Sequence, residues 1–125
     1  MNKPNTWLTF SNPNQWNDWL SQHQNETDVW IEIQKKNSKK VGIHLDEAVI
    51  EALCFGWIDS VMYSIDQDCF VLRMTPRKPH SPWSLINKNR ALLLIEENRM
   101  QDRGYQAIEI AQANGWWDKA YTSLK

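Results

Sequence analysis

The chain opens with the pattern of an amphipathic helix. Asn12-Pro13 is a typical helix start, because asparagine accepts a hydrogen bond from the first turn and proline suits the first helical position. Beyond it, apolar and aromatic residues recur at the spacing of one helix face: Trp16, Trp19, Leu20 and His23. We expect a helix here, with His23 at the boundary of its apolar stripe.

A second helix is predicted from Leu45 to Phe55. Asp46 and Glu47 lie in its first turn, where carboxylates complement the helix dipole. Gly56 suits the left-handed residue that ends a helix. The apolar stripe consists of Leu45, Ala48, Val49, Ala52 and Leu53.

Two more helices are expected near the C-terminus. Ser81-Pro82 repeats the start signature, and the helix continues to about Asn98, which can adopt a left-handed cap. Asp102 is expected to cap a fourth helix, which Asn114-Gly115 ends. The inner faces are predicted to carry Trp83, Ile86, Asn87, Arg90, Ala91, Leu94 and Ile95 in the first, and Gly104, Ala107, Ile108 and Ala111 in the second. A C-terminal tail is expected to pack through Trp116, Trp117 and Tyr121.

Three segments have the two-residue alternation of strands. They are Asp28 to Gln34, Trp57 to Ile65 and Cys69 to Met74. The short connection at residues 66–68 predicts that the last two pair as an antiparallel hairpin. In the third strand, Phe70, Leu72 and Met74 are expected on one face, and Arg73 on the other with Cys69 and Val71.

The predicted order of elements is α-β-α-β-β-α-α. A chain of 125 residues without an internal linker or repeat is expected to form one domain, residues 1–125, around one core. We predict an α+β fold, with a small, mainly antiparallel sheet of about three strands covered by about four helices. Most of the eight tryptophans are expected in that core.

Charge is distributed unevenly along the chain, although the net charge is −1. Nine of the fourteen cations lie in two windows without an acidic residue, 33–45 and 69–95. The connector from Lys35 to Lys40 is interpreted as a solvated loop, and a phosphate-binding loop is the alternative. The later window contains Arg73, Arg77, Lys78, Lys88 and Arg90, so a local basic patch is expected on a nearly neutral protein.

The sequence indicates no cofactor. Cys54 and Cys69 are far apart and match no metal or disulfide pattern, and the three histidines form no recognisable metal set. Met1 to Phe10 has no apolar segment typical of a signal peptide, and no run is long enough to span a membrane. We therefore expect a cytoplasmic protein with reduced thiols; its oligomeric state is not indicated.

The chain resembles the YdeI/OmpD-associated family, also called bacteriocin-protection proteins. The likeness rests on Ala52–Ser60, on Thr75–Pro79 and on Ser81–Asn87, and extends to Trp16–Leu20 and Val29–Ile31. The likeness also includes Gly104 and the C-terminal segment Asn114-Gly115-Trp116, so it covers nearly the whole chain. The resemblance implies a role in envelope stress or antimicrobial-peptide resistance, with some members described as periplasmic, and it implies no catalytic residues.

The best candidate site combines the two central blocks of this resemblance. Arg77, Lys78 and His80 precede the helix start expected at Ser81, whose free N–H groups would attract an anion. Two tryptophans would form its walls and stack on a ring, Trp57 and Trp83. In the alternative interpretation, Ser81 only caps the helix and Arg77 forms a structural ion pair with Asp59.

Three other residues have both a chemical and a structural interpretation. Asp59 would need a partner or a buried setting to act as a base, and we favour a structural role. Cys54 near a helix C-terminus is expected to be a buried, inert thiol. Asn87 would bind a ligand or tie the helix to the loop that carries Arg77, and we favour the second role.

Three classes of function follow from these patterns. The leading hypothesis is a non-enzymatic accessory protein that binds a small anionic ligand between residues 56–60 and 77–87. The second is nucleic-acid binding through residues 69–95, which the net charge of −1 disfavours. The third is an unrecognised enzyme, and a protein partner is a further option.

Overall fold

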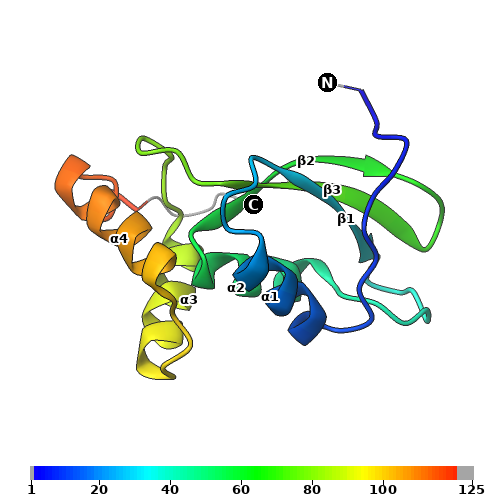
Figure 1. Cartoon of the computed structure of the whole chain (residues 1–125), viewed down its shortest axis with the longest axis horizontal. Coiled ribbons are helices and arrows are strands. Elements are labelled where there is room, and N and C mark those ends of the chain that lie inside the picture. The colour runs from blue at the N-terminus through cyan, green and yellow to red at the C-terminus, as the bar shows by residue number, and fades with distance from the viewer. Residues whose placement is uncertain (1, 121–125) are drawn as a thin grey trace.

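The computed structural model describes residues 2–120 and confirms the predicted order and fold class (Figure 1). The predicted contribution of Tyr121 lies outside the described residues. The elements are α1 (Pro13–Gln22), β1 (Val29–Gln34), α2 (Leu45–Cys54), β2 (Trp57–Ser64), β3 (Cys69–Pro76), α3 (Leu85–Glu96) and α4 (Asp102–Asn114).

The three strands form one antiparallel sheet in the order β1-β3-β2. The predicted hairpin of β2 and β3 is therefore confirmed, and β3 is the central strand. Its register with β2 shifts between Asp59 and Met62, which marks a bulge. Leu8 forms a parallel bridge to Ile31, so the N-terminal segment covers the outer edge of β1.

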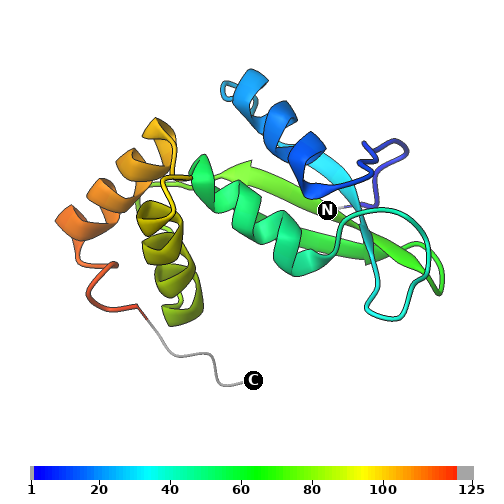
Figure 2. The same ribbon diagram turned by 90° about the horizontal axis from the view of Figure 1, so that it is seen from below.

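Helices α1 and α2 cover one face of the sheet, and α2 lies between α1 and α3 (Figures 1 and 2). The inward side chains of β1 and β3 are fully buried beneath them, namely Ile31, Ile33, Leu72 and Met74. As predicted, Arg73 alternates to the other face, where its Nε donates to Asp28 at 2.9 Å. No helix within residues 2–120 is long and apolar enough to cross a membrane.

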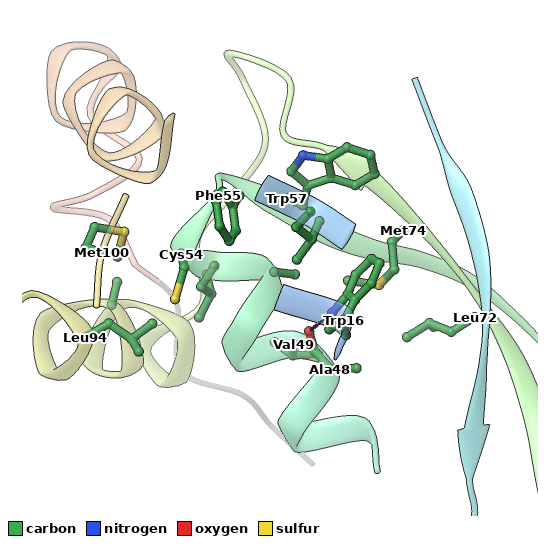
Figure 3. Close-up of a cluster of buried hydrophobic side chains, with 14 of the residues drawn as sticks. Trp16, Ala48, Val49, Cys54, Phe55, Trp57, Leu72, Met74, Leu94 and Met100 are labelled. Atoms are coloured by element: carbon green, nitrogen blue, oxygen red, sulfur yellow. Dashed lines mark hydrogen bonds between the residues drawn. The ribbon is translucent and has the colours of Figure 1, made fainter. Parts of the chain in front are cut away.

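Tryptophan side chains join α1 to the core. Trp16 is fully buried, and its Nε1 donates to the carbonyl oxygen of Ala48 in α2 at 3.0 Å (Figure 3). Trp19 stacks on His23 with ring centroids 4.3 Å apart, and it meets Trp57 edge-on at 6.0 Å. The predicted stripe of α1 is thus the face that packs against α2 and the sheet.

Several predicted helix ends are confirmed. Asn12 accepts a hydrogen bond from the Gln15 N–H at 3.0 Å, and Gly56 adopts a φ of 73° after α2. Asn98 also adopts a positive φ, 60°, after α3. The position of Asp102 is a small correction, because Gln101 is the N-cap of α4 and Asp102 lies in its first turn.

The start of α3 is the main correction to the predicted elements. The helix begins at Leu85, and its N-cap is Ser84, whose Oγ accepts from the Asn87 N–H at 3.1 Å. Both Ser81 and Ser84 have the chemistry of a cap, so burial of Trp83 decides between them. Trp83 is 2% exposed, and the backbone that carries it is not helical. Because the helix starts later than predicted, Ile86 is half exposed and does not lie on the inner face.

Candidate functional site

The loop that follows β3, residues 77–84, carries most of the predicted site. Ser81 closes a turn in it: the Ser81 N–H donates to the Lys78 carbonyl oxygen at 3.0 Å, and the Lys78 N–H donates to Ser81 Oγ at 3.1 Å. The side-chain amide of Asn114 donates to the carbonyl oxygen of Pro79, which ties the loop to α4. The anion site expected at a helix N-terminus is therefore not formed at Ser81, because no helix begins there.

Arg77 and Trp83 make the central contact of the loop. The guanidinium of Arg77 lies over the Trp83 ring, 3.9 Å from its centroid, and Nη1 donates to the Pro82 carbonyl oxygen at 3.1 Å. The Trp83 ring also meets Trp117 edge-on at 5.1 Å. These contacts hold Arg77 beside Trp83 rather than beside Asp59, so the alternative ion pair is not the observed arrangement.

A small hollow of about 70 Å³ opens beside this contact. Arg77, Lys78, Ser81 and Trp83 form its loop side, and a face of α4 with Ala107, Ile110 and Ala111 forms the other. None of the described residues that line it is acidic. The hollow therefore combines two cations and a hydroxyl with an apolar floor, which is a setting that favours an anion.

The predicted tryptophan walls are not available to a ring-shaped ligand. Trp57 is 1% exposed and belongs to the core, and the face of Trp83 is covered by Arg77. His80 is exposed in the turn and does not line the hollow. Of the predicted set, this hollow brings together Arg77, Lys78, Ser81 and Trp83, and Trp57 lines a second hollow with Arg77.

Asp59 and Asn87 lie in a separate groove of about 520 Å³ between β2 and the first turns of α2 and α3. Asn87 Oδ1 accepts from Arg90 Nη1 at 3.1 Å, and Arg90 Nη2 bonds Asp46 at 3.2 Å. The interpretation of the Asn87 side chain as a tie to the loop with Arg77 is therefore wrong in its partner, since its Oδ1 accepts from Arg90 of its own helix. The predicted single cleft is divided between two places.

Cys54 is buried at the end of α2, as expected. Burial raises the pKa of its thiol to about 11, and the nearby carboxylate of Glu51 adds to this effect. Glu51 is itself buried and paired with Arg99 at 2.5 Å. At neutral pH Cys54 is therefore a protonated thiol with little nucleophilic character.

No group of three histidine, cysteine or carboxylate side chains within residues 2–120 is arranged to hold a metal ion. A family model described as "Domain of unknown function (DUF8412)" matches residues 8–107. The chain belongs to this family. The comparisons with curated proteins and with solved structures found no match to the chain.

The sequence did not single out Arg103. Arg103 lies in the first turn of α4 and lines a second hollow of about 170 Å³ together with Arg77. The signal that could have found it is its helical spacing with Ala107 and Ile110, at i, i+4 and i+7 on one face of α4.

Proposed function

We propose that this DUF8412 domain is a non-enzymatic accessory protein that binds a small anion in the hollow beside Arg77. The observation that carries the proposal is the guanidinium held 3.9 Å over the Trp83 ring at a hollow that also contains Lys78. Stacking on the ring restricts the guanidinium, so less conformational entropy is lost when it binds an oxyanion.

The size of the hollow supports a small ligand. Its volume of about 70 Å³ is far below the roughly 300–1,000 Å³ of sites for drug-sized molecules. A phosphate or carboxylate group therefore suits it better than a nucleotide or a cofactor. Because the hollow is open to solvent, the affinity should be modest and should fall with ionic strength.

The test is an amide and indole NMR titration with inorganic phosphate at low ionic strength. We expect saturable shifts at Lys78, Ser81 and Trp83, with a dissociation constant on the order of 1 mM. Arg77→Ala should weaken binding at least tenfold, about 1.4 kcal/mol. The lost contact with Trp83 should contribute about 0.5–2 kcal/mol to the decrease in the free energy of unfolding.

Two further variants sharpen the result. Arg90→Ala removes a cation from the separate groove and should leave phosphate binding unchanged. Lys78→Gln, at an exposed position, should weaken binding about threefold without a change in stability. If phosphate produces no saturable shifts, or if Arg77→Ala unfolds the domain while Lys78→Gln binds normally, Arg77 has a structural role and the proposal is wrong.

The nucleic-acid alternative uses the basic residues of the 69–95 window. Arg73 is paired with Asp28, Lys88 Nζ donates to the Trp117 carbonyl oxygen at 3.0 Å, and Arg90 is paired with Asp46. Because these three cations already have partners within the protein, they do not form a continuous basic face. This favours binding of a small anion over binding of nucleic acid. Adding a short single-stranded DNA in the same titration, with shifts spread over residues 73–90 and a steep loss with salt, would favour nucleic acid instead.

The remaining parts of the proposal concern the cellular setting. Two buried cysteines without a disulfide between them suit the reducing cytoplasm, which we propose as the location. The resemblance to YdeI/OmpD-associated proteins supports a role in stress or antimicrobial-peptide resistance, where a protein partner could be engaged. An enzymatic function would instead require turnover that disappears on substitution of Asp59 or Cys54.

A further inference from the structure

The hollow beside Trp83 adjoins a second one along α4. Arg77, Ala107 and Ile110 line both, so the two hollows are neighbouring parts of one groove between the loop and α4. The second part has a volume of about 170 Å³ and extends to the turn at Gly56 and to Arg103.

Gly56 places the two arginines on either side of this turn. The Arg77 N–H donates to the Gly56 carbonyl oxygen at 2.9 Å. On the other side, a Cβ atom at Gly56 would lie 2.8 Å from the carbonyl oxygen of Arg103. The turn therefore holds the backbone of both arginines close to Gly56.

The charge of Arg103 is not neutralised by its side-chain contacts. Its Nη1 donates to the Gln24 carbonyl oxygen and its Nη2 to Asn25 Oδ1, both at 2.8 Å, and both acceptors are uncharged. Every charged residue described along the two hollows is a cation: Arg77, Lys78 and Arg103. In a protein with a net charge of −1, the charged lining described for this groove is therefore entirely cationic.

Both arginines line the second hollow. On α4, Arg103 precedes Ala107, a residue that lines both hollows with Arg77, by four residues or about 6 Å of helix rise. We propose that the groove binds a small ligand with two anionic groups, one at Arg77 and Lys78 and the other at Arg103. This inference rests on the proposed function and adds the second binding position and the class of ligand.

The test compares acetate with the dicarboxylates succinate, glutarate and adipate by NMR titration of the full chain at constant ionic strength. Two tethered carboxylates bind with a high effective concentration. At least one of these diacids should therefore bind at least tenfold more tightly than acetate. Arg103→Gln should abolish this advantage and leave acetate binding unchanged, whereas Arg103→Lys should keep most of it.

The controls separate this inference from the proposed function. Arg90→Gln, in the other groove, should retain the dicarboxylate preference. If acetate, phosphate and the diacids all produce no saturable NMR shifts in the wild type, both the proposed function and this inference are wrong. Acetate binding without a dicarboxylate advantage, or an advantage that survives in folded Arg103→Gln, would overturn this inference alone.

Discussion

Gly56 is the residue on which the geometry of the groove depends most directly. Its φ of 73° is strained for residues with a Cβ atom, and the Arg103 carbonyl oxygen occupies the space that such an atom would need. Gly115 has a similar φ of 89°, but among residues 2–120 a Cβ there would meet only Lys119 Cε, at 3.9 Å. Substitution of Gly115 therefore measures the cost of the left-handed backbone, and substitution of Gly56 measures that cost together with a steric clash.

We expect Gly56→Ala to lower the free energy of unfolding by about 3 kcal/mol or more. About 1–2 kcal/mol comes from the left-handed conformation, and the remainder comes from the clash with backbone that cannot easily move. Gly115→Ala should cost only about 1–2 kcal/mol, the conformational part. Urea unfolding of both variants measures the difference, and equal losses would contradict the role assigned to the Arg103 carbonyl.

At the level of elements, the start of α3 determines what the preceding loop can do. Because the helix begins at Leu85, Ser81 and Pro82 remain in the loop that carries Trp83 to Arg77. A helix that began at Ser81 would place Trp83 on helical backbone. The late start is thus a condition for the contact between the guanidinium and the indole.

Alanine substitutions at the two serines test this start. Ser84→Ala removes the side-chain oxygen that accepts from the Asn87 N–H, so we expect it to destabilise the protein by about 1 kcal/mol. Ser81→Ala removes one hydrogen bond in an exposed turn and should cost about 0.5 kcal/mol or less. Thermal unfolding of both variants measures this, and a larger loss at Ser81 would indicate that the helix begins there.

Across the whole molecule, Cys54 lies where three helices meet. Figure 3 shows Cys54 of α2 near Leu94 of α3 and Met100, which precedes α4. The Gln101 N–H donates to the Cys54 carbonyl oxygen at 3.0 Å. Gly104 fits against the same carbonyl, so exposing the thiol requires α3 and α4 to separate from α2.

The reactivity of Cys54 should therefore report unfolding of this part of the molecule. In a Cys69→Ser background at pH 8, we expect a thiol reagent to label Cys54 at least a hundredfold more slowly than the denatured chain. Its raised pKa also predicts a pH effect: the thiol ionises more readily when unfolded, so its contribution to stability is present below pH 9.0 and is lost as the pH rises through about 11. Fast labelling of the native protein would show that α4 opens readily.

Local patterns predicted most of the fold. Helix periodicity, the Asn12 cap and the Gly56 end depend on residues within one or two turns of each other, and so does the short connection of the β2–β3 hairpin. Physical preferences over such distances are largely independent of the rest of the chain. The sequence by itself therefore determined the order and type of the elements, the buried thiol and the placement of Arg77 and Lys78 as neighbouring cations in one loop.

Only the tertiary structure decided which of those residues meet. Two serines offered equal capping chemistry, and burial of Trp83 selected Ser84. Asp59 and Asn87 line a different groove from Arg77 because β2 and the first turn of α3 face the start of α2 there. Arg103 and Arg77 line the same hollow because α4 packs on the turn at Gly56. Gly56 and Arg103 are 47 positions apart in the sequence, so no local preference encodes their contact.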